Sequence, residues 1–140
     1  MNDIKQVIVI RKDLNMRKGK MIAQGSHASM AVIFNYMIPN YLSPKTDIPC
    51  VFRIELPQGD IGKDMHEWMT GIFKKIVVGV DSLAELVNVY QAAKSAGLPC
   101  SIIEDKGLTE FGGEITITAC AIGPASSEKI DPITKNLSLL

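Results

Sequence analysis

The sequence has few of the features that mark several large classes of protein. Its 140 residues include 3 cysteines and no C-x-x-C pair, which indicates reduced thiols and a cytoplasmic location. Its apolar runs are only a few residues long, far short of the ~18 residues that a membrane helix needs. The run near the N-terminus is also too short for a signal peptide. We therefore expect one globular domain over residues 1–140 and no membrane partner.

The formal net charge is zero, because the 15 basic and 15 acidic side chains cancel. This balance excludes a protein that binds nucleic acid through its overall charge. The charge is unevenly spread, since residues 1–20 hold six basic side chains and two acidic ones. From charge alone, this segment is either a solvated loop or the edge of a polyanion site. Its basic residues are Lys5, Arg11, Lys12, Arg17, Lys18 and Lys20.

Alternating strand and helix patterns predict an α/β fold. Runs of β-branched and apolar residues predict buried strands at 6–11, 74–80, 100–105 and 115–123. Helix-favouring segments lie at 18–36 and 63–72, and a third helix opens at the Ser82–Glu85 capping box. A short terminal helix is expected to begin at Gly123-Pro124 and to end or kink at Asp131-Pro132.

The lengths of the connections predict how the strands run. Helical connections favour parallel strands with right-handed crossovers, whereas the short loop at 105–114 makes the last strand antiparallel. We therefore expect a four-stranded mixed sheet, three strands parallel and the last antiparallel, with helices on both faces. The insert at 37–67 is predicted to add a short strand over 50–56. Sites in such sheets form at the carboxyl ends of parallel strands, here the loops at 12–20, 81–82 and 105–114.

Common cofactor and nucleophile motifs are absent. The sequence contains no G-x-G-x-x-G, no G-x-x-x-x-G-K-[ST] and no G-x-S-x-G. His27 and His66 together with the cysteines show no zinc spacing. We therefore expect neither an organic cofactor nor a metal site.

One stripe of the first predicted helix carries polar side chains that suit an anion. Lys20, Gln24 and His27 are spaced so that they fall on one face, and Lys20 lies in the first turn near the positive helix end. A cation, an amide and an imidazole in a row could bind a phosphate or a developing oxyanion. The alternative is a solvated Lys20 and a His27 that packs structurally.

Asp105 is the second candidate, because it ends an apolar strand at the edge where a ligand is expected. A carboxylate there could act as a base or orient a nucleophile, and Gly107 would permit a tight turn behind it. The alternative is a turn aspartate that caps nearby N–H groups. Thr109 supplies a hydroxyl four residues later, while Thr116 and Thr118 share one face of the last strand.

These residues recur in a known pattern. The segment VIVIRKDLNMRKGKMIAQGSHAS (7–29) is similar to V-R-x-D-L-x-M-x-K-G-K-x-A-A-Q-x-x-H-A, the motif of the type-2 peptidyl-tRNA hydrolases. The resemblance resumes at WMTGIFKKIVVGVDS (68–82), AAKSAGLPCSIIEDKGLT (92–109) and TACAIGPASSEKIDPITKNLSLL (118–140). The chain thus resembles this family over roughly 100 residues, in order.

The resemblance implies a three-layer α/β/α fold, usually a homodimer, and no organic cofactor. It implies hydrolysis of the ester that joins a peptide to the tRNA 3′ end. The catalytic residues it implies are Lys20, Asp105 and Thr109. The substrate-binding residues that we expect are Arg11, Lys12, Arg17, Lys18, Gln24, His27, Thr116 and Thr118. The chain differs from the family beside the catalytic threonine, where the common Arg and Gln are replaced by Leu108 and Glu110.

Two other readings of the residues stay open at this stage. The chain could be a non-catalytic member of the fold that binds RNA or a protein. It could also be a related esterase that acts on aminoacyl-tRNA.

Overall fold

A computed structural model describes residues 3–38, 51–108 and 111–140, so Thr109 and Glu110 lie outside the described residues. The elements follow one another as β1 (Ile4–Arg11), α1 (Lys18–Phe34), β2 (Met37–Ile38), β3 (Arg53–Ile54), α2 (Asp60–Thr70), β4 (Lys75–Val80), α3 (Leu83–Ser95), β5 (Cys100–Asp105), β6 (Thr116–Ser126), α4 (Ser127–Thr134) and β7 (Ser138–Leu139). In the described part of the chain, no helix has the length and apolar character needed to cross a bilayer.

The main sheet has five strands, in the order β5-β6-β1-β4-β7. β1 pairs with β4 in parallel, while β6 lies between β1 and β5 and runs antiparallel to both. The predicted mixed sheet and the antiparallel direction of β6 are confirmed, whereas four strands with three paired in parallel are wrong, because the described residues contain one parallel pair and a fifth strand, β7. The physical reason is that the short loop after β5 returns the chain as a hairpin. This places β6 beside β5 and leaves the other edge of β6 for β1.

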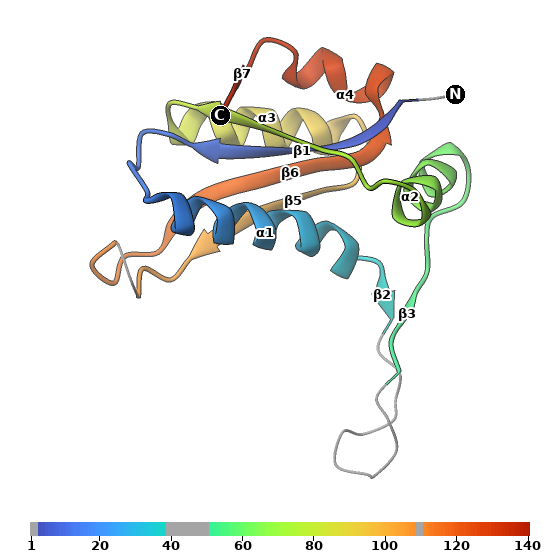
Figure 1. Ribbon diagram of the computed structural model, residues 1–140, viewed down its shortest axis with the longest axis horizontal. Helices are drawn as coiled ribbons and strands as arrows, with labels where there is room; N and C mark the ends of the chain where they lie inside the picture. The colour runs from blue at the N-terminus through green and yellow to red at the C-terminus, as the bar shows by residue number, and fades with distance from the viewer. Residues whose placement is uncertain (1–2, 39–50, 109–110) are drawn as a thin grey trace.

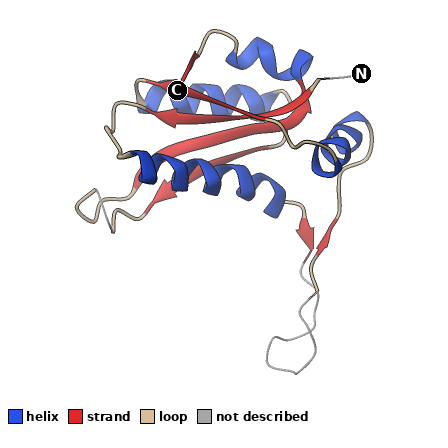
Figure 2. Ribbon diagram, viewed as in Figure 1, coloured by secondary structure: helices blue, strands red, loops and turns tan. Residues whose placement is uncertain are grey.

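Helices cover both faces of the sheet, which gives the three layers expected from the resemblance (Figure 1). α1 packs on one face, where Ala28 and Val32 meet Ile8 and Ile10 of β1. α3 and α4 pack together on the opposite face, in the larger of the two apolar clusters (Figure 2). That cluster includes Val9, Leu86, Ile122 and Ile130, all essentially fully buried.

α1 lies close to β1 because small residues face the sheet. A Cβ on Gly25 would stand 3.4 Å from the Cγ2 of Ile8, so there is little room for a larger side chain. Two buried hydrogen bonds join Gln6 of β1 to Ser29: Ser29 Oγ donates to Gln6 Oε1, and Gln6 Nε2 donates to the Ser29 carbonyl. The helix is thus seated by packing and by buried polar contacts.

The predicted start of α3 is confirmed. The backbone N–H of Glu85 donates to Ser82 Oγ at 3.1 Å, and Glu85 Oε2 accepts from the backbone N–H of Asp81 at 2.8 Å. The first contact satisfies an N–H group that the first turn of a helix leaves without an intrahelical partner, and the second ties the Glu85 side chain to the residue before the N-cap.

The terminal helix begins later than predicted. β6 continues through Gly123-Pro124, because Ala125 and Ser126 still pair with Lys5 and Ile4 of β1. α4 then starts at Ser127 and runs past Pro132 to Thr134, so Pro124 does not begin the helix and Pro132 does not end it.

The insert after α1 forms a separate hairpin. Its strand is shorter than the predicted 50–56 and pairs outside the main sheet, with Met37 opposite Ile54 and Ile38 opposite Arg53. Three prolines of the insert, Pro39, Pro44 and Pro49, lie outside the described residues. The hairpin follows the C-terminal end of α1 (Figure 1), away from the end that carries Lys20.

Candidate active site

The carboxyl ends of β1 and β5 meet at one edge of the sheet, because β6 runs antiparallel to both strands. α1 starts at this edge, and Asp105 is the last residue of β5. The Lys20 ammonium, in the first turn of α1, lies 2.6 Å from Asp105 Oδ2. Their side chains are only 13% and 12% exposed. Two candidates that lie far apart in the sequence thus form one ion pair that is largely shielded from water.

Both carboxylate oxygens of Asp105 accept hydrogen bonds. Oδ2 accepts from Lys20 and, at 3.0 Å, from Gln24 Nε2, while Oδ1 accepts from the Gly107 backbone N–H at 2.7 Å. The Lys20 hydrogen bond is the main cause that holds the pKa of Asp105 below its usual 3.8. Partial burial opposes this effect, while Gly107 and Gln24 reinforce it. Asp105 is therefore a carboxylate at neutral pH.

The turn behind Asp105 depends on Gly107, as the sequence predicted. Gly107 has a φ of +74°, and a Cβ at this position would stand 2.3 Å from the backbone oxygen of Glu114. Any other residue would therefore be strained in the backbone and would also collide with the returning arm of the loop.

Gln24 is buried and held from two sides. Thr118 Oγ1 donates to Gln24 Oε1 at 2.5 Å, and Gln24 Nε2 donates to Asp105 Oδ2. Thr118 is 0% exposed, so its hydroxyl has no access to solvent. Because the threonine occupies the amide oxygen, it determines that the NH₂ end of Gln24 faces the carboxylate.

The ion pair lines an open groove of about 320 Å³ between α1 and the end of β5. His27 also lines this groove and is exposed, so the whole predicted stripe of α1 faces it. Leu108 lies at the groove with 85% of its surface exposed. The other residues that line it are Glu104 and Lys106. The groove therefore combines cations, carboxylates, an amide and an imidazole, which suits a polar substrate.

The two strand threonines occupy different environments. Thr116 stands opposite Asp105 in the β5–β6 register, but its hydroxyl donates to the Glu114 carbonyl at 3.2 Å. Thr118 is the threonine that contacts the Lys20–Gln24–Asp105 cluster. Thr109 falls outside the described residues.

Arg11 is already engaged within the protein. Its Nε and Nη2 donate to the two carboxylate oxygens of Asp13, at 3.1 and 2.6 Å. Its Nη1 donates to the carbonyl of Ile117 at 2.9 Å. The side chain is 12% exposed, so the guanidinium is largely taken up by protein partners.

The other basic candidates lie around the start of α1. Lys12 Nζ is 3.3 Å from Asp81 Oδ1, in an exposed pair. Arg17 is the exposed N-cap residue of α1, and Lys18 is exposed in its first turn. Lys18 faces a different groove from Lys20, because the two side chains leave opposite sides of the helix.

Sequence reasoning missed two features of the site. The first is Phe111, whose ring centroid lies 5.6 Å from the Lys20 ammonium, close enough for a cation–π contact. The second is the direct contact of Thr118 with Gln24. No periodicity or motif signals either contact, because both depend on the paths of loops and bulges. Among the described residues, no group of three or more His, Cys, Asp or Glu side chains could hold a metal ion.

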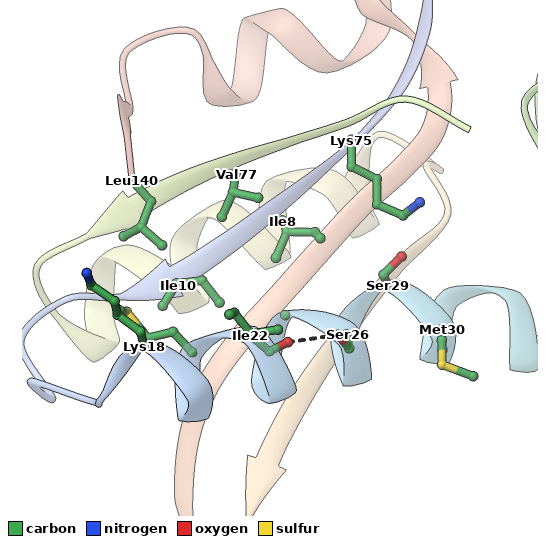
Figure 3. Close-up of a pocket in the computed structure, with 12 residues that line it drawn as sticks. Ile8, Ile10, Lys18, Ile22, Ser26, Ser29, Met30, Lys75, Val77 and Leu140 are labelled. Carbon is green, nitrogen blue, oxygen red and sulfur yellow. Dashed lines mark hydrogen bonds between the residues drawn. The ribbon is translucent and has the colours of Figure 1, made fainter. Parts of the chain in front are cut away.

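A larger groove of about 580 Å³ lies on the other side of α1, against β1 and β4 (Figure 3). Ile8, Ile10 and Val77 form its apolar base, with Lys18 and Lys75 toward its two ends (Figure 3). A neighbouring groove shares Ser29, Met30 and Lys75 with it. We call this continuous surface the α1–β4 face. Its exposed large apolar residues are Ile22, Met30, Phe34, Phe73 and Leu140, at 70%, 54%, 52%, 55% and 50% exposure.

Comparisons with known proteins confirm the family that the sequence resembles. The model of the family described as Peptidyl-tRNA hydrolase PTH2 matches residues 4–140. The peptidyl-tRNA hydrolase of Methanocaldococcus jannaschii is 44% identical over 137 residues, which cover 98% of this chain and 100% of that protein. The peptidyl-tRNA hydrolase of Methanothermobacter thermautotrophicus is 36% identical over 137 residues, with coverage of 98% and 100%.

One solved structure has a similar fold. It is a protein of unknown function, Atu0240, from Agrobacterium tumefaciens, with a TM-score of 0.58 and 13% identity. The likeness covers 100% of this chain and 99% of that chain. At this identity, it concerns the fold alone.

Proposed function

This chain belongs to the PTH2 family of peptidyl-tRNA hydrolases, and we propose that it cleaves its substrate at the Lys20–Asp105 ion pair. The reaction is hydrolysis of the ester between a peptide and the tRNA 3′ end. The observation that carries this assignment is a shielded cation–carboxylate pair at 2.6 Å in the wall of a polar groove. Gln24 and Thr118 support it, because they hold the carboxylate in a defined orientation.

Lys20 stabilises the negative charge that develops during the reaction. When water adds to the ester carbonyl, the carbonyl oxygen becomes an oxyanion, and a preorganised cation lowers the energy of that state. Asp105 and Phe111 keep the ammonium in place on the groove wall. Shielding from water strengthens its electrostatic effect on the oxyanion.

Asp105 orients the attacking water rather than removing its proton. An efficient general base has a pKa near the working pH, whereas the Lys20 hydrogen bond holds the pKa of Asp105 below 3.8. Both of its oxygens also accept hydrogen bonds within the protein. Its main contributions are to hold Lys20 and to position the water.

The substrate atoms change in a simple way. The water oxygen bonds to the acyl carbon, the ester C–O bond breaks, and a water proton ends on the ribose 3′ oxygen. To Thr109, one of the catalytic residues that the resemblance implies, we assign a hydrogen bond to the leaving 3′ oxygen or its neighbour. His27, exposed in the groove, contacts the substrate beyond the ester.

Asp105→Asn tests the assignment, because it keeps the shape of the side chain and removes its charge. Turnover of N-blocked aminoacyl-tRNA, measured as release of free tRNA, should fall by about 10²–10³-fold, the usual worth of one preorganised group. The matched control is Asp60→Asn in the exposed first turn of α2, which should keep the wild-type rate. A near-normal rate in Asp105→Asn would return Asp105 to the role of a turn cap.

We also propose that Lys12, Arg17 and Lys18 contact tRNA phosphates. All three are exposed around the start of α1, the helix end whose first turn also carries Lys20. Helix N-termini and clustered cations attract phosphate groups.

Single neutral variants of these three residues should weaken tRNA binding. Each lost phosphate contact should flatten the plot of log affinity against log salt concentration by ~0.7–0.9. Arg53→Gln is the control, because Arg53 is exposed on the hairpin at the far end of α1. Unchanged slopes for Lys12→Gln, Arg17→Gln and Lys18→Gln would mean that the RNA lies elsewhere.

A homodimer is our proposal for the assembly, with a second copy on the α1–β4 face. The face is apolar and continuous over two grooves. Gly25, Ser26 and Ser29 line it on α1, and such small residues let another element approach closely. Large exposed apolar patches of this kind mark protein interaction sites.

A cytoplasmic location is also proposed. Cys100 and Cys120 are free thiols in the structure, which suits a reducing compartment. Burial raises the pKa of Cys120 to about 12, so this thiol is protonated and unreactive.

A further inference from the structure

We propose that Arg11 is a positioning residue for catalysis, which fixes the strand segment that carries Thr118. Asp13 holds the guanidinium through Nε and Nη2, and Nη1 donates to the Ile117 carbonyl at 2.9 Å. Through Thr118, this contact would determine how Gln24 meets Asp105. The inference rests on the proposed function of the Lys20–Asp105 pair and adds a group outside the groove to it.

The first argument for this role is the point at which the pairing of β1 with β6 stops. The β1–β6 ladder ends at Ile10 opposite Ala119, yet β6 begins three residues earlier, at Thr116. β1 itself ends at Arg11, so its main chain offers no ladder partner to Ile117. In place of a main-chain partner, the Arg11 guanidinium donates a hydrogen bond to the Ile117 carbonyl. Arg11 thus extends the support of β6 beyond the end of β1.

This segment of β6 also contains a β-bulge, which interrupts its hydrogen-bonded pairing with β5. In the β5–β6 register, Ile103 faces Ala119 and Glu104 faces Ile117, so Thr118 is the extra residue on β6. Bulges occur next to active sites, where they re-aim a side chain at the cost of local pairing. Here the bulged residue is Thr118, whose hydroxyl donates to Gln24 on α1. The carbonyl that Arg11 holds belongs to the residue beside the bulge.

The orientation of the Gln24 amide links the bulge to the ion pair. With Thr118 as donor to its oxygen, Gln24 presents its NH₂ to Asp105 Oδ2 at 3.0 Å. A flipped amide would put a carbonyl oxygen against a carboxylate, which is repulsive. A bulge that moves would therefore disturb Asp105 without any direct contact to it. Displacements of about 1 Å in such supports can cost about 100-fold in rate.

The same contacts argue against Arg11 as a phosphate ligand. Asp13 neutralises its charge through a bidentate pair, and Nη1 donates to the backbone carbonyl of Ile117. A phosphate would have to displace the Asp13 carboxylate or the Ile117 carbonyl from a side chain that is only 12% exposed. A geometric role and an RNA-binding role predict opposite results, so they can be separated.

Three variants separate them in the full-length protein, assayed with N-blocked aminoacyl-tRNA. Arg11→Gln and Asp13→Asn change the local charge in opposite directions, and Arg11→Lys keeps it. We expect kcat to fall in all three, by up to about 100-fold for Arg11→Gln. KM and the salt dependence of tRNA binding should stay near the wild-type values. Arg11→Lys should not rescue kcat, because one ammonium cannot span Asp13 and Ile117.

A double-mutant cycle with Thr118→Val tests whether Arg11 acts through the bulge. Valine keeps the shape of threonine and removes the hydroxyl that holds Gln24. If Arg11 acts through Thr118, Arg11→Gln should lower kcat further by no more than about twofold in the Thr118→Val background. Melting temperatures of all variants should lie well above the assay temperature, so that a loss of kcat is not a loss of folded protein.

Several outcomes would overturn the inference. One is a higher KM and a salt slope flatter by ~0.7–0.9 in Arg11→Gln, with tighter tRNA binding in Asp13→Asn, since these are the marks of a phosphate contact. Another is a full multiplicative loss of kcat in the double variant. Asp105→Asn is run in parallel. If Asp105→Asn is inactive while the Arg11 variants keep the wild-type kcat, only the inference about Arg11 fails. If Asp105→Asn is active, the proposed function of the Lys20–Asp105 pair fails, and the inference about Arg11 fails with it.

Discussion

Asp105 holds more hydrogen bonds than a simple turn aspartate needs. A capping role would be met by the Gly107 N–H alone, yet Lys20 and Gln24 also donate to this carboxylate. Burying a lysine and a carboxylate costs solvation energy, so such an ion pair is a poor means of stabilising a fold. Its position at a groove gives it a chemical use.

The titration of Asp105 provides a test at the residue scale. Its carboxyl carbon, followed by NMR, should titrate below pH 3.8, because Lys20 favours the charged form. In Lys20→Met the pKa should rise, since burial then acts without the cation. Because the folded-state pKa is depressed, the stability that the pair contributes is present above pH 3.8 and disappears as the pH falls through the folded-state pKa.

The control for this titration is Lys106→Met. Lys106 lines the same groove but makes no hydrogen bond to Asp105, so its removal should shift the titration far less. A wild-type Asp105 that titrates at or above pH 3.8 would contradict the ion pair.

Individual residues of the site differed in how well the sequence predicted them. Lys20, Gln24 and His27 could be grouped because helical spacing is regular. Asp105 could be placed near them because strand ends converge at one edge of a sheet. Thr116 and Thr118 could not be separated, because the bulge on β6 interrupts the alternation of strand residues. The Arg11–Asp13 ion pair could not be predicted from the sequence, because a run of charged residues usually indicates a solvated surface.

Among the elements, α1 has the most varied surroundings. One side carries the Lys20 groove, the opposite side forms part of the α1–β4 face, and the side between them packs on the sheet. Polar contacts hold the helix in register as well as apolar ones. Ser101 Oγ on β5 donates to the Ala28 carbonyl at 2.7 Å, and Gln6 on β1 bridges Ser29 and the Gly123 carbonyl.

Gln6→Met should test how much the polar contacts contribute. Methionine keeps the length of glutamine but leaves the Ser29 hydroxyl and the Gly123 carbonyl without their partner. Because Gln6 is 0% exposed, water cannot replace it, and the free energy of unfolding should fall by about 1–3 kcal/mol. Urea denaturation measures this. Gln91→Met on the exposed side of α3 should change it by less than about 0.5 kcal/mol.

The type of each main element was predictable, whereas the sheet order was not. β-branched runs identified β1, β4, β5 and β6, because buried strands need apolar residues on both faces. The strand order depends on which neighbouring strand each new strand pairs with, and no local sequence pattern determines this choice. β7 was missed because Ser138–Leu139 is too short to show alternation.

The whole molecule is asymmetric, with a polar groove on one side of α1 and the α1–β4 face on the other. Ile22→Lys should place a charge in the apolar face and shift a dimer to monomers in sedimentation experiments. Leu83→Lys on α3 is the control, because Leu83 is also exposed but lies on the opposite layer. Wild-type protein that sediments as a monomer at micromolar concentration would refute the proposed assembly.

The single tryptophan of the chain stands beside this face. Trp68 is 7% exposed, and its indole N–H donates to the Lys74 carbonyl at 2.8 Å. Its ring meets Phe73 edge-on, with centroids 6.2 Å apart. Tryptophan fluorescence therefore originates at one known place in the molecule. Dilution that separates the proposed dimer should change this emission, because the second copy would lie beside the ring, whereas substrate bound in the Lys20 groove should leave it nearly unchanged. The chain thus carries an optical reporter for the proposed association that needs no label.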